Sequence, residues 1–211
     1  MSKLIEQLNW RYATKRMNNE KVPGQKLNII LDAIRLTPSS SGLQPYKIIV
    51  ISNESLKEKI HLKACSQSQI FECSHLLVFA NKTSISPEYI DESMALIAEA
   101  RQIPIEHLED FSILVKNQFA SISQTEQAIA SSKQTYIALG TALIAAASEA
   151  IDACPIEGFN PPVLDEILNL KEQGLQSAVL LALGYRNDTI DFLANSTKVR
   201  KSKKDLFIQM A

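Results

Sequence analysis

Aromatic residues, cysteine and net charge are all scarce in this chain of 211 residues. Aromatics make up 6% of it, three residues are cysteine, and 22 Lys and Arg against 23 Asp and Glu leave a formal net charge of −1. A near-neutral chain has no broad positive field, so we expect no nucleic-acid partner. Three cysteines without CxxC spacing argue against a disulfide scaffold or a cysteine-rich zinc site and are typical of a reducing compartment.

Targeting segments and long apolar runs are also missing. The opening residues, MSKLIEQLNWRY, lack the basic and then apolar order of a signal peptide. The most apolar stretch, YIALGTALIAAA at 136–147, is too short to span a bilayer. We expect it to be buried on most faces, either in the core or at a subunit interface. We therefore expect a cytoplasmic protein with no membrane partner, folded as one domain over residues 1–211.

Hydrophobic periodicity predicts helices that alternate with short buried strands, an arrangement typical of α/β or α+β proteins. The expected strands are short apolar runs at 46–52, 75–80, 154–156 and 177–185. The expected helices cover 25–37, 55–65, 86–119 with a break at Pro104, 124–150 and 160–170. The second helix is expected to begin with a capping box of Ser55 and Glu58, and the last with Asn160 as its N-cap.

Common catalytic motifs are absent. The chain has no GxGxxG after a strand, no GxxxxGK[ST], no HExxH and no GxSxG, so a Rossmann fold, a P-loop and the corresponding hydrolases are not indicated. The three histidines, His61, His75 and His107, are scattered, and we interpret His75 as structural. Cys65 and Cys73 are interpreted as core residues, and no metal site is predicted.

Four polar segments have both an ordinary and a functional interpretation. RYATKR at 11–16 is either a solvated charge run or an anion clamp in which Arg11 and Lys15 converge. KVRKSKK at 198–204, taken alone, is typical of a solubilising or weakly nucleic-acid-binding tail, and it has no interleaved aromatics to stack on bases. TPSSSGLQP at 37–45 is either a helix-to-strand loop or a ligand cradle. PIEGF at 155–159 is either an ordinary connection or a set of backbone N–H groups near a positive helix end, suited to an electron-rich atom.

Taken in chain order, the four segments resemble the nitroreductase family of FMN-dependent NAD(P)H oxidoreductases, and in particular its oxygen-insensitive nitroreductase and flavin reductase branch. The family has an Arg-x-[Ser/Ala]-x-[Lys/Arg] opening, a Pro-Ser-Ser-x-x-x-Gln-Pro loop, a Pro-Ile-Glu-Gly-Phe turn and a closing Lys-x-Arg. The matching segments are Arg11–Lys15, Pro38–Pro45, Pro155–Phe159 and Lys198–Arg200. The resemblance implies an α+β fold with a central, mostly antiparallel sheet flanked by helices. It also implies a homodimer with the long central helix at its interface and FMN sites across it.

The resemblance assigns residues to a tightly but non-covalently bound FMN. Arg11, Lys198 and Arg200 would bind the phosphate, and Lys15 would lie at the pyrimidine edge of the ring. The backbone N–H groups of Glu157 and Gly158 would face N5, and Lys15 and Glu157 are the catalytic candidates. Further FMN contacts are expected from Tyr12, Ala13, Pro38, Ser39, Ser40, Gly42, Gln67, Gln69, Pro155 and Ile156.

The family mechanism implies that NADH or NADPH delivers hydride to flavin N5, and that a nitroaromatic, quinone or flavin acceptor then takes the same place. The sequence does not indicate which nicotinamide is preferred. Two alternatives remain open. One is another FMN chemistry of the family: dihydropteridine reduction, ene-reduction, dehalogenation or flavin fragmentation. The other is a non-enzymatic binding protein.

Three positions need separate comment. Gly42 stands where family members often have Asn, and Gln69 stands where some have a second Lys near the flavin. A neutral Gln stabilises a reduced, anionic flavin less than Lys does, so we expect a lower flavin potential than in the lysine members. Phe119, in the variable region 84–123, either stacks over the acceptor or packs in the core.

Overall fold

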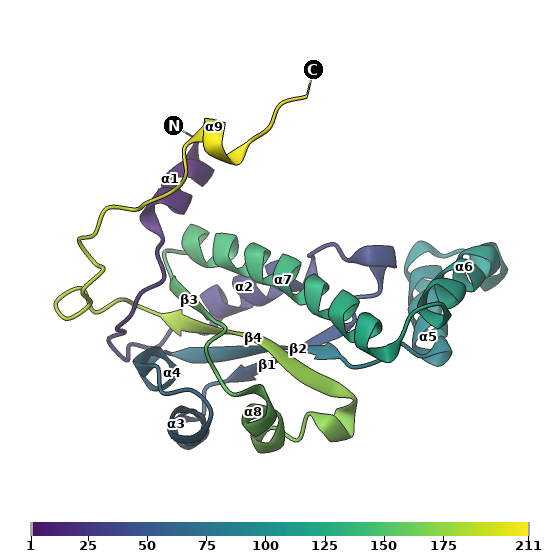
Figure 1. Cartoon of the computed structure of the whole chain (residues 1–211), viewed down its shortest axis with the longest axis horizontal. Coiled ribbons are helices and arrows are strands. Elements are labelled where there is room, and N and C mark those ends of the chain that lie inside the picture. Colours follow the sequence, from purple (N-terminus) through teal and green to yellow (C-terminus); the bar gives the residue numbers. More distant parts are fainter. Residues whose placement is uncertain (1, 211) are drawn as a thin grey trace.

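The computed structural model describes residues 2–210, and a four-stranded sheet lies at its centre (Figure 1). The strands are β1 (Tyr46–Ile51), β2 (His75–Lys82), β3 (Asp152–Ile156) and β4 (Leu175–Gly184), in the order β1-β2-β4-β3. Each neighbouring pair is antiparallel. Each strand overlaps a predicted one, and the predicted antiparallel sheet of an α+β fold is confirmed.

Helices cover both faces of the sheet (Figure 1). On one face lie α2 (Gly24–Arg35) and α7 (Gln124–Ser148), and on the other lie α3 (Glu54–Lys63), α4 (Ser68–Glu72) and α8 (Pro161–Ile167). The other helices are α1 (Lys3–Trp10), α5 (Pro87–Arg101), α6 (Glu109–Ala120) and α9 (Lys203–Leu206), and short 3-10 turns occupy Ser40–Gly42, Ile105–Leu108 and Lys171–Gln173.

The sheet is buried on both faces, which explains why its central strands are apolar at almost every position. Along β2, Leu77 and Phe79 pack under α2 and α7, whereas Leu76 and Val78 pack against α3, α4 and α8. Successive side chains of a strand point to opposite faces, so a strand covered on both sides needs a continuous apolar run. That run made β2 and β4 recognisable in the sequence.

One of the two predicted helix caps is found. Asn160 Oδ1 accepts a hydrogen bond from the backbone N–H of Val163 at 3.4 Å, which confirms Asn160 as the N-cap of α8. The predicted Ser55 cap of α3 is wrong, because Asn53 precedes it and accepts the backbone N–H of Leu56 at 2.8 Å. Ser55 therefore lies inside the first turn.

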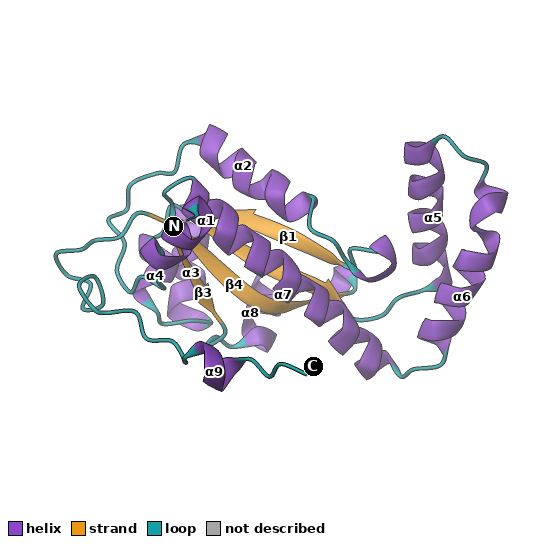
Figure 2. Ribbon diagram, turned by 90° about the horizontal axis from the view of Figure 1, so that it is seen from above, coloured by secondary structure: helices purple, strands orange, loops and turns teal. Residues whose placement is uncertain are grey.

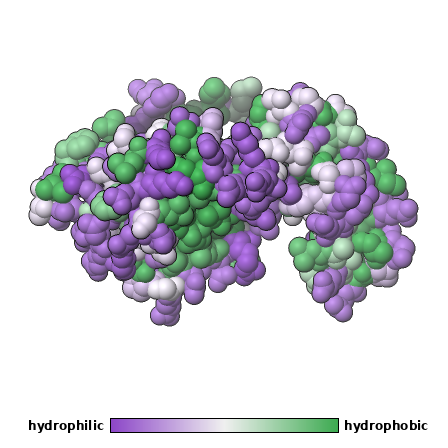
Figure 3. Space-filling view, turned by 90° about the horizontal axis from the view of Figure 1, so that it is seen from below, coloured by the Kyte–Doolittle hydropathy of each residue, from purple (hydrophilic) through white to green (hydrophobic). Residues whose placement is uncertain are grey.

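Helices α5 and α6 form a hairpin that projects from the body of the molecule (Figure 2). Gln102 ends α5 in the left-handed conformation, and Pro104 precedes the 3-10 turn that leads to α6, so the predicted break is confirmed. Inside the hairpin, Ile90, Met94 and Val115 belong to a separate apolar cluster. A cavity of about 540 Å³ lies between α2, β1 and α5, and Figure 3 shows the molecule hollowed between the body and the hairpin.

Helix α7 is buried on one side only. Ala138, Ala142 and Ala146 face the sheet and are fully buried, whereas Ile137 and Ile144 on the opposite side are 46% and 43% exposed. The prediction of burial on most faces is therefore wrong for the isolated chain. A Cβ atom added at Gly140 would meet nothing within 4 Å, so this glycine does not serve close packing inside the chain. None of the helices formed by residues 2–210 combines the length and apolar character needed to cross a membrane.

Candidate functional site

A cavity of about 540 Å³ opens where the segment after α1 meets the tail after β4 and the end of β3. In Figure 1 the segment after α1 and the tail lie together at one end of the sheet. Two stretches that are far apart in the sequence therefore form one wall. Seven of the residues assigned from the family resemblance line this cavity: Arg11, Tyr12, Ala13, Lys15, Pro155, Lys198 and Arg200.

The cavity is cationic, and its cations are poorly compensated. Burial lowers the pKa of Arg11, and the neighbouring charge of Arg200 lowers it further. The buried Nε of Arg11 has no hydrogen-bond partner among residues 2–210. Burial and the charges of Arg11 and Arg200 also lower the pKa of Lys198. Its ammonium group donates to the carbonyls of Leu8 and Arg11 at the end of α1, where the helix dipole favours a cation. An unpaired buried donor and repelling cations fit an anionic ligand.

Arg186 also lines the cavity and was not predicted. Its guanidinium lies over the rings of Trp10 and Tyr12, at 4.4 and 4.6 Å from their centroids. Its Nη2 lies 2.6 Å from Oδ1 of the buried Asp152, so its charge is compensated within the chain. We infer a structural role, in which Arg186 holds both aromatic rings at the rim. An arginine directly after an apolar strand carries no sequence signal for this.

Asp191 is a second residue that sequence reasoning missed. It follows β4, is 5% exposed, and accepts hydrogen bonds through Oδ2 from the Tyr12 hydroxyl, the Thr14 hydroxyl and the Lys15 backbone N–H, at 2.9, 2.6 and 2.8 Å. Burial opposes its ionisation, but the hydrogen bonds outweigh burial and lower its pKa. Asp191 is one of three acids in the polar tail and belongs to no recognisable motif.

The predicted glutamines support the cavity from behind and do not line it. Gln69 is 3% exposed and its Nε2 donates to the carbonyl of Thr14 at 3.1 Å, directly before Lys15. Gln67 Nε2 donates to the carbonyl of Gly158 at 3.4 Å. Both side chains come from α4 or its N-cap position, so this short helix fixes the backbone next to two predicted site residues.

The Pro155–Phe159 turn leads from β3 toward α8. Pro155 lines the cavity and Ile156 is buried in the core. The Glu157 side chain is engaged elsewhere, since its Oε1 accepts the Tyr136 hydroxyl at 2.5 Å. Burial and this bond to a carboxylate raise the pKa of Tyr136 to about 12. Tyr136 lies on the exposed side of α7 and was hidden from sequence reasoning within an apolar run.

The serine loop does not join the cavity within one chain. Pro38, Ser39, Ser40 and Gly42 lie between α2 and β1, at the end of the sheet opposite the cationic cavity (Figures 1 and 2). Ser39 Oγ accepts the backbone N–H of Gln44 at 2.8 Å, and the backbone N–H of Ser40 donates to Gln134 of α7 at 2.9 Å. The serine loop and the residues that line the cationic cavity thus lie at opposite ends of the sheet.

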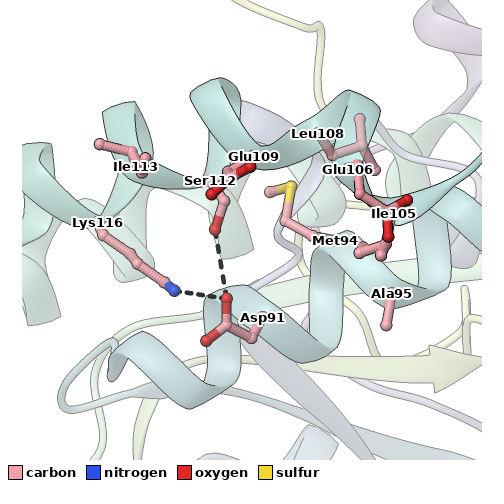
Figure 4. A pocket seen from close by; sticks show the side chains of 10 residues that line it. All are labelled: Asp91, Met94, Ala95, Ile105, Glu106, Leu108, Glu109, Ser112, Ile113 and Lys116. Atoms are coloured by element: carbon pink, nitrogen blue, oxygen red, sulfur yellow. Dashed lines mark hydrogen bonds and ion pairs between the residues drawn. The ribbon is translucent and has the colours of Figure 1, made fainter.

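A third cavity, of about 530 Å³, lies between α5 and α6 and contains none of the assigned FMN residues (Figure 4). Lys116 Nζ lies 2.6 Å from Oδ1 of Asp91, and the Ser112 hydroxyl donates to the same oxygen at 3.3 Å. Phe119, the predicted acceptor contact, is 9% exposed and packs in the hairpin cluster with Leu43. Stacking of Phe119 over an acceptor stays a prediction.

Comparison with known proteins identifies the family. The sequence model of the nitroreductase family matches residues 8–185, and the chain belongs to that family, as predicted. The major NAD(P)H-flavin oxidoreductase of Aliivibrio fischeri is 32% identical over 210 residues, covering 96% of each chain.

Solved structures confirm the nitroreductase-like fold. A nitroreductase family protein from Streptococcus pneumoniae superimposes with a TM-score of 0.81 at 18% identity, covering 99% of this chain and 100% of the other. A structure from Exiguobacterium sibiricum, determined in complex with FMN, gives a TM-score of 0.82 at 18% identity, covering 100% and 98%. At these identities the likeness concerns the fold.

Proposed function

We propose that this protein is an FMN-dependent NAD(P)H oxidoreductase that reduces nitroaromatic, quinone or flavin acceptors. The observation that carries the proposal is the cationic cavity, where Arg11, Lys198 and Arg200 repel one another and the buried Nε of Arg11 has no partner among residues 2–210. A flavin phosphate would supply the missing charge and acceptors. The 32% identity to an NAD(P)H-flavin oxidoreductase over nearly the whole chain supports the same assignment.

The residues of the cavity suit the two parts of FMN. Charge-assisted hydrogen bonds contribute about 1.5–3 kcal/mol each, so three cations can hold a phosphate tightly without a covalent bond. FMN, when bound, accepts hydride from NADH or NADPH and passes it to the acceptor. Lys15 lines the same cavity and would supply a positive charge to the ring of a flavin held there. Such a preorganised charge stabilises negative charge that develops on a bound group.

The surroundings of Lys15 and of the Pro155–Phe159 turn hold the proposed catalytic groups in place. The peptide bond between Thr14 and Lys15 is held at both of its polar atoms, by Asp191 at the N–H and by Gln69 at the carbonyl. Gln67 and Tyr136 fix the turn at the Gly158 carbonyl and the Glu157 carboxylate. We propose that the backbone N–H groups of this turn face the flavin.

We further propose a homodimer in which each FMN site takes residues from both chains. The open side of α7 carries the apolar side chains of Ile129, Tyr136, Ile137 and Ile144. An exposed apolar face of this kind is typical of a protein interface. Pairing across α7 would cover it and would bring the serine loop of one chain within reach of the cationic cavity of the other. A site assembled in this way uses both groups of assigned residues.

The absorption spectrum of the purified protein tests the proposal. We expect a flavin band that bleaches on anaerobic addition of NADH or NADPH and returns on addition of a nitroaromatic compound or a quinone. An FMN band that bleaches but returns with neither acceptor would uphold the flavoprotein assignment and exclude these acceptors. A colourless protein that also fails to bind added FMN would refute the proposal.

A further inference from the structure

Asp191 joins the two ends of the chain at the cationic cavity. Its Oδ2 accepts three hydrogen bonds from the segment after α1, through the Tyr12 hydroxyl, the Thr14 hydroxyl and the Lys15 N–H. Its Oδ1 accepts the backbone N–H of Leu193 at 2.9 Å, within its own tail. One buried carboxylate therefore holds the segment that carries Arg11 and Lys15 and shapes the tail that leads to Lys198.

Other contacts between these two stretches lie on either side of Asp191. The backbone N–H of Asn187 donates to the carbonyl of Arg16 at 2.9 Å, which fixes the start of the tail. Lys198 donates hydrogen bonds to carbonyls at the end of α1, which fixes the far part of the tail. Between these points, Asp191 sets how the tail lies against the 12–15 segment. A small shift there would move Arg11 relative to Lys198 and Arg200, whose like charges oppose their convergence.

We propose that Asp191 is a positioning residue for the flavin phosphate, holding the Arg11–Lys15 segment against the tail so that Arg11, Lys198 and Arg200 converge on one anion. The inference rests on the proposed function, since it takes the FMN phosphate as that anion. Asp191 itself does not line the cavity and need not touch the ligand. Its four hydrogen bonds come from neutral donors. The carboxylate therefore holds the segment in place and does not neutralise a phosphate-binding cation through an ion pair.

The test compares FMN with riboflavin, which lacks the phosphate, in fluorescence titrations of the apoprotein. Asp191→Asn keeps the shape of the side chain but places an NH₂ group against hydrogen-bond donors. We expect the Kd for FMN to rise about 10–100-fold, because the cations lose their common alignment, and the Kd for riboflavin to rise much less, because riboflavin makes only the ring and ribityl contacts. The ratio of the two affinities therefore falls. Loss of general stability alone would leave the ratio unchanged.

Asp165→Asn is the matched control. Asp165 is equally buried, at 6% exposed, and its Oδ1 accepts the backbone N–H of Ser177 at 2.9 Å, but Asp165 lies in α8 and bonds near the start of β4, whereas Asp191 follows the end of that strand. We expect it to lower stability without changing the ratio. Thr14→Val provides a milder variant should Asp191→Asn fail to fold, because it removes one donor from the same carboxylate. It should lower the ratio in the same direction.

The outcomes separate this inference from the proposed function. A wild-type ratio of FMN to riboflavin affinity in folded Asp191→Asn, or in Thr14→Val when the first variant does not fold, overturns the role of Asp191. Wild-type protein that binds neither flavin overturns the proposed function itself. Wild-type protein that binds riboflavin as tightly as FMN overturns the assignment of the cations to a phosphate.

Discussion

Replacing Arg11 with Met should stabilise the apoprotein and weaken its binding of FMN. In the absence of an anion, Arg11 carries two costs, a buried Nε that makes no hydrogen bond among the described residues and repulsion from Arg200. Met keeps the apolar stem of the side chain and removes both costs. The same substitution removes one of the three cations that we assign to the flavin phosphate.

The two effects have different sizes as well as opposite signs. An unsatisfied buried donor costs about 1–3 kcal/mol and an exposed like-charge pair at most about 1 kcal/mol. Because the cavity is open to solvent, we take the lower end, a gain of about 1 kcal/mol, which corresponds to a rise in Tm of about 2–4 °C for a chain of this length. Loss of one charge-assisted bond to phosphate costs about 1.5–3 kcal/mol, or about 10–100-fold in Kd.

Thermal melting of the apoprotein and fluorescence titration with FMN measure both effects on the same samples. Added salt should raise the Tm of the wild-type apoprotein more than that of Arg11→Met, since screening relieves a repulsion that the variant lacks. Lys201→Met, which removes a cation from the exposed tail, serves as the control and should change neither quantity. A variant that melts below the wild type and binds FMN equally well would refute the reasoning.

Three further predictions concern the flavin, the dimer and the thiols. Gln69→Lys places a cation behind Lys15 and should raise the midpoint potential of bound FMN in a redox titration; an unchanged potential would contradict the role given to this position. Ile144→Glu puts a charge on the open side of α7 and should give a monomer that has lost FMN in sedimentation, whereas Leu62→Glu, on the exposed surface of α3, should leave the wild-type assembly intact. Burial raises the pKa of every thiol, that of Cys73 to about 12, so a thiol reagent should label the native protein at neutral pH only on unfolding; rapid labelling of Cys65, Cys73 or Cys154 would count against the packing.

The positions of the helices and strands could be predicted because burial leaves a local periodic pattern. A strand such as β2, covered on both faces, is apolar throughout, and an amphipathic helix such as α2 repeats its apolar residues at helical spacing. The order of the strands could not be predicted, because antiparallel pairing of β2 with β4 joins residues about a hundred positions apart. The cap of α3 was misplaced because Asn53 and Ser55 are both good N-caps, and the earlier one takes the free N–H group.

The candidate site likewise has residues that could be predicted from the sequence and residues that could not. Cations close together in the sequence, such as Arg11 and Lys15, form recognisable motifs, and the structure places them with Lys198 and Arg200 around one cavity. Residues that hold those motifs in place from distant positions in the chain form no local pattern in the sequence. Asp191 is one of three acids in the polar tail, and Tyr136 is one of several hydroxyl residues of α7, yet each holds a segment that the motifs identify.

The separation of the serine loop from the cationic cavity is the strongest structural argument for a two-chain site. The serine loop lies at one end of the sheet and the cationic cavity opens at the other, and a sheet packed on both faces does not bend to bring its ends together. If both segments bind one flavin, the second segment must come from another molecule. The open apolar side of α7 provides the surface on which that molecule would pack. A dilution series then has a definite expectation: FMN release should follow dissociation of the dimer, and a monomer that keeps FMN would show that the serine loop is not part of the site.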